Sequence, residues 1–174
     1  MTDDEVQSIT RADALPTAPL AKTLLALNNA NAQELSWLEP ERLAHLVGQA
    51  FLARRIGNLD ALVLAFDQDA HYDSPNFLWF RQRYPRFVYV DRIVVASSAR
   101  GRGHARALYD DLFEHAVATG HARVVCEVNT QPPNPGSDAF HAALGFVEVG
   151  AASIYDGSRT VRYLSRALPA SVPR

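Results

Sequence analysis

The chain has 174 residues, of which 48% are hydrophobic and 21% are charged, and its formal net charge is −2 at pH 7. This composition excludes a disordered chain and favours a single domain over residues 1–174, with an ordered core over about 6–168. The near-neutral balance excludes the strongly basic footprint typical of proteins whose main partner is nucleic acid. Because no apolar run approaches the roughly 20 residues of a membrane helix, and the N-terminus is too acidic for a secretory signal, we expect no membrane partner and a cytoplasmic location.

The cysteine and arginine content bears on disulfides, on metal sites and on how much weight a single arginine carries. Cys126 is the only cysteine, so no disulfide can form within the chain, and no Cys or His spacing resembles a zinc site. We therefore expect no metal. Cys126 lies in an apolar stretch, where an inert buried thiol is more common than a nucleophile. A single arginine is weak evidence of function here, because Lys22 is the only lysine among the 17 basic residues.

The N-terminal half predicts a strand, two helical segments and a hairpin, in that order. A short strand is expected within residues 6–13, and leucine spacing predicts a helix over 18–35 and a second helical segment, broken near its proline, over 36–50. Two apolar stretches within 50–67 flank Gly-Asn-Leu-Asp, which is typical of a β-hairpin. Residues 68–86 hold five aromatic side chains without a clear period, and we interpret them as a long loop.

The C-terminal half alternates strands and helices before a closing hairpin. Residues 87–96 are rich in β-branched and aromatic side chains and predict a strand. Apolar spacings of three and four predict an amphipathic helix over 103–119. A strand over 122–129, a short helix over 132–145 and a hairpin over 146–168 follow. The order predicts an α/β (α+β) fold with a mixed, mostly antiparallel central sheet of six to seven strands flanked by about four helices.

The junction between the strand at 87–96 and the helix that follows has the composition of an anion site. The first N–H groups of a helix lack partners within the helix, and its dipole adds positive charge there, so phosphate binds readily at such a point. Gly101 and Gly103 would let the backbone approach a ligand closely. A Walker loop is excluded because no lysine follows, and the dinucleotide fingerprint is excluded because Arg106 occupies its third glycine position.

Two motifs resemble those of one enzyme superfamily. Residues 100–105 read R-x-x-G-x-A, which resembles the (Q/R)-x-x-G-x-(G/A) pyrophosphate loop of the GNAT superfamily of acyl-CoA-dependent N-acyltransferases. Residues 134–150 are similar to the family's second conserved segment, and the pattern is held by Asn134, Phe140 and the Leu-Gly-Phe at 144–146. We expect Ser137 or Asp138 to cap the helix of that segment. The element order agrees over almost the whole chain, but the specific motifs occupy only parts of it.

The resemblance implies that acetyl-CoA is the acyl donor and that no metal is needed. The strand backbone would pair with the pantetheine arm, and the N–H groups of the glycine-containing loop would hold the pyrophosphate. The cofactor-binding residues implied are Ile93, Val94, Val95, Arg100, Gly101, Arg102, Gly103, His104, Ala105, Asn134 and Phe140.

The resemblance also implies a base and a proton donor for transfer to an amine. Glu127 is the first candidate base and Asp91 the second; each could instead be a structural carboxylate, with Arg92 as the partner of Glu127. His141 stands where the family often has a tyrosine close to the CoA sulfur, so it either donates a proton or only packs beside the cofactor. Tyr155 could substitute as donor from the closing hairpin.

In the family, the acceptor site is formed by the first helices and by loops around the central strands. That placement implies Asn28, Trp79 and Tyr84 as acceptor-binding residues, and further candidates are Asn29, Trp37, Tyr72 and Asn76. The aromatic side chains of this region could equally fill the core. The expected function is transfer of an acetyl group to a primary amine of an unidentified small molecule or peptide, by direct attack in a ternary complex. The alternative is an acyl-CoA-binding domain without catalysis. A nucleic-acid role for the Arg-Gly-Arg-Gly stretch is disfavoured by the net charge, and a homodimer is left open.

Overall fold

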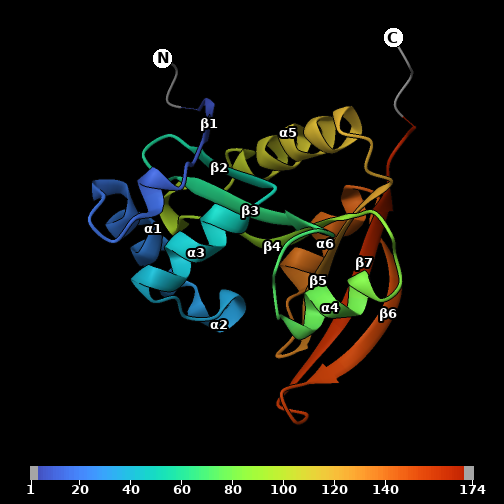
Figure 1. Cartoon of the computed structure of the whole chain (residues 1–174). Coiled ribbons are helices and arrows are strands. Elements are labelled where there is room, and N and C mark those ends of the chain that lie inside the picture. Colours follow the sequence, from blue (N-terminus) through green and yellow to red (C-terminus); the bar gives the residue numbers. More distant parts are fainter. Residues whose placement is uncertain (1–3, 171–174) are drawn as a thin grey trace.

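The computed structural model describes residues 4–170, and Figure 1 shows its arrangement. Seven strands form one sheet in the order β1-β2-β3-β4-β5-β7-β6, and every neighbouring pair is antiparallel except β4 and β5. The strands are β1 (Val6–Ser8), β2 (Leu52–Ile56), β3 (Ala61–Asp67), β4 (Val88–Val95), β5 (Arg123–Gln131), β6 (Val147–Ile154) and β7 (Arg159–Ala167). The predicted fold class, a mixed and mostly antiparallel sheet, is confirmed.

Helices cover both faces of the sheet. They are α1 (Pro19–Ala30), α2 (Ala32–Leu35), α3 (Pro40–Gln49), α4 (Pro75–Arg81), α5 (His104–Ala118) and α6 (Pro135–Ala143), with short 3-10 turns at Ala12–Ala14 and Ser97–Ala99. One apolar cluster joins α1, α3 and α4 to one face, and a second joins α5 and the end of α6 to the other. In Figure 1, α5 accordingly lies across the opposite side of the sheet from α1 and α3.

The stretch predicted to be a loop, 68–86, contains the helix α4, so that prediction was wrong. Proline stands at the start of α4, where its fixed φ suits a first helical turn. Phe77 and Phe80 are completely buried, whereas Trp79 is only partly buried. The helix spans two turns and carries apolar side chains on most sides, so its sequence shows no amphipathic period.

Two local predictions differ from the structure, and both concern the start of a helix. Pro40 begins α3 instead of breaking a longer helix. Asn134 caps α6, because its side chain accepts from the backbone N–H of Ser137, so neither Ser137 nor Asp138 is the cap. The helices also outnumber the four expected, because α2 and α4 are each shorter than an ordinary amphipathic helix.

The feature of the fold that creates a site is the seam between β4 and β5. These parallel strands pair only at Val88 with Val124 and at Tyr89 with Val125. Beyond those positions β4 stays paired with β3, and its register shifts where Asp91 bulges out of the ladder. The edge of β4 that faces β5 is therefore left open from Val90 onward. An open strand edge can accept an extended ligand as an additional strand.

Candidate functional site

A groove of about 550 Å³ runs along the open edge of β4 toward the start of α5. We call it the groove; its lining residues are Asn31, Glu34, Leu35, Ile93, Val94, Val95, Arg100, Ala105, Asn134, Gly136, Ser137, Phe140 and His141. It continues into a depression over residues 100–105, the glycine loop, through shared contacts with Val95, Arg100, Ala105 and Phe140. Of the predicted cofactor residues, all except Arg102 thus line one continuous surface.

The glycine loop leaves room for a ligand at the start of α5. Gly101 and Gly103 have φ angles of 78° and 80°, a left-handed conformation that side chains other than glycine rarely adopt. A Cβ built on either residue would meet no heavy atom within 4 Å. Gly103 is the residue before the first turn of the 15-residue helix α5, whose N–H groups lack partners within the helix. The loop therefore fits an anionic group such as pyrophosphate.

Two side chains of the loop turn away from this space. Arg102 pairs with Asp4 at 2.7 Å and with Asp60 at 3.5 Å. His104 is buried, and its Nε2 lies 3.8 Å from the same Asp4 carboxylate. Arg100 is exposed and lines the groove itself. Of the three charged or ionisable side chains predicted here, Arg100 alone is directed to the groove.

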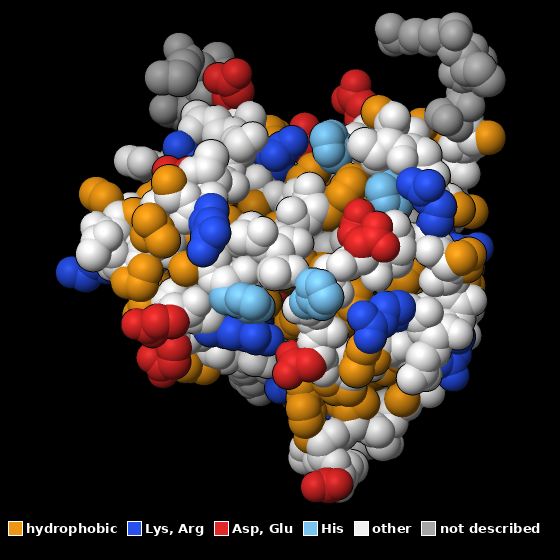
Figure 2. Space-filling view, viewed as in Figure 1, with side chains coloured by type: hydrophobic (Ala, Val, Ile, Leu, Met, Phe, Trp, Pro, Cys, Tyr) orange, Lys and Arg blue, Asp and Glu red, His pale blue; other side chains and the backbone are white. Residues whose placement is uncertain are grey.

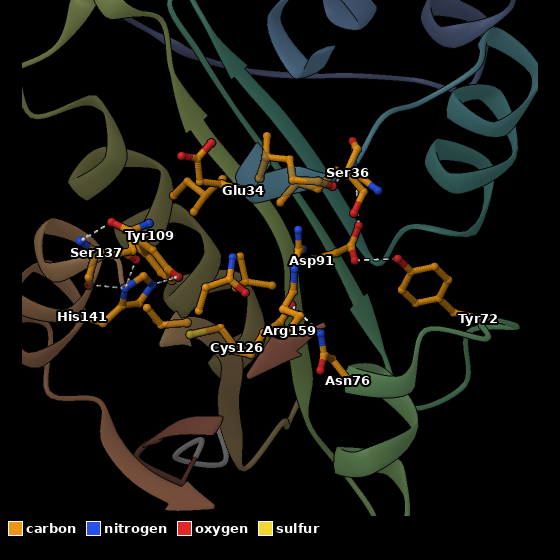
Figure 3. A pocket seen from close by; sticks show the side chains of 18 of the residues that line it. Glu34, Ser36, Tyr72, Asn76, Asp91, Tyr109, Cys126, Ser137, His141 and Arg159 are labelled. Atoms are coloured by element: carbon orange, nitrogen blue, oxygen red, sulfur yellow. Dashed lines mark hydrogen bonds and ion pairs between the residues drawn. The ribbon is translucent and has the colours of Figure 1, made fainter. Parts of the chain in front are cut away.

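A second cavity, of about 140 Å³, lies in the gap between β4 and β5. We call it the pocket, and Figure 3 shows its labelled side chains converging from α2, β4, β5, α6 and the β6–β7 hairpin. Its polar lining residues are Glu34, Ser36, Tyr72, Asn76, Asp91, Arg92, Tyr109, Cys126, Glu127, Asn129, Asn134, Ser137, His141, Tyr155 and Arg159. Glu34, Ile93, Ser137 and His141 line both the pocket and the groove. A ligand in the groove would therefore end beside the pocket.

Glu127 presents one carboxylate oxygen without a partner in this pocket. Oε1 accepts from Asn76 Nδ2 and from the Tyr89 hydroxyl, each at 3.0 Å. Oε2 is buried and has no hydrogen-bond partner among the described residues. Burial raises the pKa of Glu127 to about 8, and the nearby Asp91 charge adds to the increase. Tyr163 fixes the arrangement by donating to Asn76 Oδ1 at 2.9 Å.

Asp91, the other candidate base, has both oxygens occupied. Oδ1 accepts from the Tyr72 hydroxyl at 2.6 Å and Oδ2 from Arg92 Nε at 2.9 Å. Arg92 is itself buried and donates to Asn28 and to backbone carbonyls at the end of α2. The partner of Arg92 is thus Asp91 and not Glu127. Burial raises the pKa of Asp91, with Arg92 opposing the increase.

His141 is buried, and both of its ring nitrogens are engaged. Nδ1 lies 2.7 Å from the backbone oxygen of Ser137, which can only accept, so Nδ1 carries the proton. Nε2 then accepts from the Tyr109 hydroxyl at 2.7 Å. Burial lowers the pKa of His141 and keeps the ring neutral. The neutral ring has no free N–H to offer the pocket.

Cys126 and Tyr155 also line the pocket. Cys126 is buried, and burial raises the pKa of its thiol, which disfavours the thiolate that a nucleophile requires. Tyr155 is 59% exposed at the end of the hairpin, with a φ of 52°. Neither residue combines access to the pocket with a fixed, activated group.

Of the acceptor residues predicted from the sequence, Tyr72 and Asn76 line the pocket, whereas Asn28, Trp79 and Tyr84 do not. Asn28 is buried beneath it and accepts from Arg92 at 2.8 Å. Trp79 stacks on Tyr163 with ring centroids 4.1 Å apart, and Tyr84 lies under the Arg123 guanidinium. These aromatic side chains serve packing, which was the alternative left open by the sequence.

Sequence analysis missed several residues that line the pocket. Tyr109 belongs to the apolar stripe of α5, so its period indicated only a core residue. Arg159 stands at the start of the last strand without any motif around it. The register of β5 against β7, which places Glu127 opposite Tyr163, could not be deduced from local patterns.

Comparison with known sequences decides the family. The signature of the acetyltransferase (GNAT) family matches residues 29–146, which include both motifs and the pocket-lining parts of β4 and β5. The chain belongs to the GNAT acetyltransferase family. The predicted superfamily and enzyme class are thereby confirmed. A search of curated protein sequences finds no match.

Solved structures share the GNAT fold over nearly the whole chain. Ard1 from Thermoplasma volcanium is 13% identical with a TM-score of 0.72, covering 97% of this chain and 99% of that one. The ribosomal-protein-S18-alanine N-acetyltransferase from Escherichia coli is 17% identical with a TM-score of 0.68, covering 98% and 96%. A phosphinothricin acetyltransferase from Sinorhizobium meliloti, in complex with AcCoA, is 16% identical with a TM-score of 0.68, covering 99% and 93%. At these identities the likeness shows the fold alone.

The part of the chain that the structure describes carries neither a metal-binding cluster nor a membrane-spanning helix. Within residues 4–170, no group of three or more His, Cys, Asp or Glu side chains is placed to hold a metal ion. None of the helices in that range has the length and apolar character needed to cross a bilayer. On the face drawn in Figure 2, acidic and basic side chains are interspersed, without one large basic area. The cytoplasmic location, the single domain and the homodimer stay predictions.

Proposed function

We propose that this GNAT protein transfers an acetyl group from acetyl-CoA to a primary amine, by direct attack within a ternary complex. The observation that carries the proposal is the unpartnered Oε2 of Glu127 in the pocket, beside the end of the groove. A carboxylate so placed can take a proton from an amine that enters the pocket. The acyl donor would occupy the groove, because the two cavities share Ile93, Ser137 and His141.

The groove and the glycine loop supply the contacts that acetyl-CoA needs. When bound, acetyl-CoA supplies the thioester acyl group. The open edge of β4 from Ile93 to Val95 offers backbone groups to the pantetheine arm. The N–H groups of Gly101 to Ala105 and the Arg100 side chain would hold the pyrophosphate.

Glu127 acts as the general base in this proposal. A lysine-like amine has a pKa of about 10.4 and is mostly protonated at neutral pH. A carboxylate whose pKa is raised to about 8 is a closer match to such an amine than an ordinary glutamate, so proton transfer costs less. Asn76 and Tyr89 hold Oε1 and leave Oε2 for the amine. The Tyr89 phenol remains protonated, because burial raises its pKa, and so it keeps donating.

Asp91 and His141 then have supporting roles. Asp91 fixes Arg92 and Tyr72 at the wall of the pocket, since both its oxygens are occupied. His141 accepts from Tyr109 and shapes the junction between the pocket and the groove. The leaving thiolate departs without a proton from His141. An ordinary thiol pKa of about 8.5 makes that leaving group acceptable at the pH where Glu127 is ionised.

Calorimetric titration with acetyl-CoA tests the donor site. Gly103→Asp should abolish micromolar binding, because a carboxylate would enter the space meant for pyrophosphate. The matched control is Gly120→Asp at the other end of α5, where φ is also positive, at 77°. Aspartate tolerates this conformation better than most residues, so both variants should fold. Equal binding by the wild type and Gly103→Asp would refute the donor site.

Turnover is tested by mass spectrometry of a library of small amines and short peptides incubated with acetyl-CoA. We expect an N-acetylated product and equimolar free CoA from the wild type. Glu127→Gln, which preserves the contact with Asn76, should reduce kcat by about 10²- to 10⁴-fold. Tight donor binding without any acetylated product would instead support the alternative of a binding domain without catalysis.

A further inference from the structure

Arg159, the first residue of β7, lines the pocket (Figure 3). Its Nη2 donates to the backbone oxygen of Gln33 at 3.1 Å, which holds the half-buried side chain between the hairpin and α2. Across residues 4–170 no ion pair involves Arg159. By contrast, Arg162 on the same strand is paired with both Asp138 and Glu148.

The Arg159 guanidinium, with one hydrogen bond to a carbonyl and no ion pair among the described residues, has N–H donors to spare. It carries five N–H donors in a rigid fork, and one contact to a carbonyl leaves most of them available. The fork matches the two oxygens of a carboxylate. Arg159 therefore offers a charged, pre-positioned donor pair in a pocket whose other function is to receive an amine.

Strand geometry puts Arg159 and Glu127 on the same face of the sheet. Arg159 and Tyr163 are four residues apart on β7, so their side chains point the same way. Tyr163 lies opposite Glu127 in the register of β5 and β7. At about 3.3 Å per residue along β7 and about 4.8 Å between strands, the main chains at Arg159 and Glu127 are roughly 14 Å apart. Both residues line the same pocket, so a small molecule that fills the pocket can contact both.

The size of the pocket limits what can lie between them. Its volume is about 140 Å³, which is similar to the roughly 150 Å³ cavity known to hold one benzene molecule. That space accommodates about six non-hydrogen atoms. An amino group, one or two carbons and a carboxylate fit such a volume.

We propose that the acceptor is a free amino acid or a similar small amine that also carries a carboxylate, which Arg159 binds while the amine faces Glu127. This inference rests on the proposed acetyltransferase function. The amino end of a peptide would bring a neutral carbonyl to Arg159 and leave the guanidinium without a counter-ion. Glu34, which also lines the pocket, would repel a second carboxylate, so acidic amino acids should be poorer acceptors.

The first experiment compares free amino acids with their amides as acceptors for the wild-type protein. An amide has a less basic amine, so a larger fraction is unprotonated at neutral pH and intrinsic reactivity favours it. We expect the free acid to have the higher kcat/KM nonetheless, by about tenfold or more. Equal or better use of the amide would overturn the inference. This comparison requires no variant and so does not depend on whether a variant folds.

The second experiment places the preference on Arg159. Arg159→Gln should lower kcat/KM for the free acid by about 10- to 100-fold, mainly through KM, and leave the amide nearly unchanged. Arg159→Lys should restore part of the loss, because it restores the charge without the fork. Lys22→Gln, at an exposed position of α1, removes one positive charge elsewhere and should have no effect. An equal loss for acid and amide in Arg159→Gln would overturn the role of Arg159.

The two proposals fail in different ways. Acetylation of short peptides but of no free amino acid would overturn the acceptor class and leave the acetyltransferase function intact. Acetyl-CoA binding with no acetylation of any amine would overturn the proposed function, and the acceptor class with it.

Discussion

Glu127 should cost the folded protein stability at alkaline pH, and replacing it should recover that stability. The folded-state pKa is about 8, against an ordinary value of 4.5. Below 4.5 the carboxyl is protonated in both the folded and the unfolded state, so the group favours neither. Between 4.5 and 8 the unfolded chain releases this proton and the folded chain retains it, so the free energy of unfolding falls as the pH rises. Above 8 the full loss is present.

The magnitude follows from the same two values. Each unit of difference between the two pKa values corresponds to about 1.36 kcal/mol, so the largest loss in the free energy of unfolding is on the order of 5 kcal/mol. Buried charges in proteins experience an effective dielectric constant nearer 20 than 4, so we expect about half of that largest loss. Glutamine is uncharged and can still accept from Asn76 and Tyr89, and it therefore lacks this pH dependence.

Urea unfolding of the wild type and Glu127→Gln at a series of pH values from 5 to 9 measures the effect. The difference between the two proteins isolates Glu127, because every other titrating group is common to both. The variant should gain stability relative to the wild type by roughly 2 to 3 kcal/mol between the two ends of the series. Parallel curves would show that the carboxyl has an ordinary pKa, and the argument for Glu127 as a base of raised pKa would then be refuted.

Three further outcomes follow from the contacts described. The kcat/KM for a chosen amine should rise with pH to a plateau with a midpoint near 8, set by Glu127, and a midpoint unchanged in Glu127→Gln would exclude that assignment. Gly150→Ala should destabilise the fold by about 1–3 kcal/mol, because the added Cβ would lie 2.5 Å from the Trp79 ring; thermal unfolding tests this, and Trp79→Leu in the same chain should remove most of the penalty. Asp91→Asn should cost about 3 kcal/mol or more of stability by leaving buried Arg92 without a counter-charge, and a variant of wild-type stability with no activity would point to a catalytic carboxylate instead.

The fold and the donor side of the site could be predicted because their signals are local. The glycine loop is a contiguous strand–turn–helix. Glycine in such a turn indicates a positive φ, and both Gly101 and Gly103 adopt one. The alternation and the spacing of apolar residues marked most strands and the long helix α5. The short helix α4 was missed because apolar side chains surround it on most sides.

The acceptor side could be predicted only in part, because the contacts that build it depend on long-range register. Asn76 meets Glu127 across 51 residues of sequence, and Arg159 meets Gln33 across 126. Trp79 and Tyr84 carried the compositional signal of a binding loop, yet their partners Tyr163 and Arg123 turn them into packing residues. The sequence indicates which residues can do chemistry, but only the paired strands decide which of them meet.

The sparse pairing of β4 with β5 also bears on what a bound ligand would do to the sheet. The strands β1 to β4 form a meander from the first 95 residues, and β5 to β7 come from residues 123–167 (Figure 1). Within each half-sheet the neighbouring strands pair at three or more positions, whereas the seam has only two paired positions. The groove and the pocket both lie along this seam. A ligand bound there would therefore hold the two half-sheets together across the joint that the backbone pairs least.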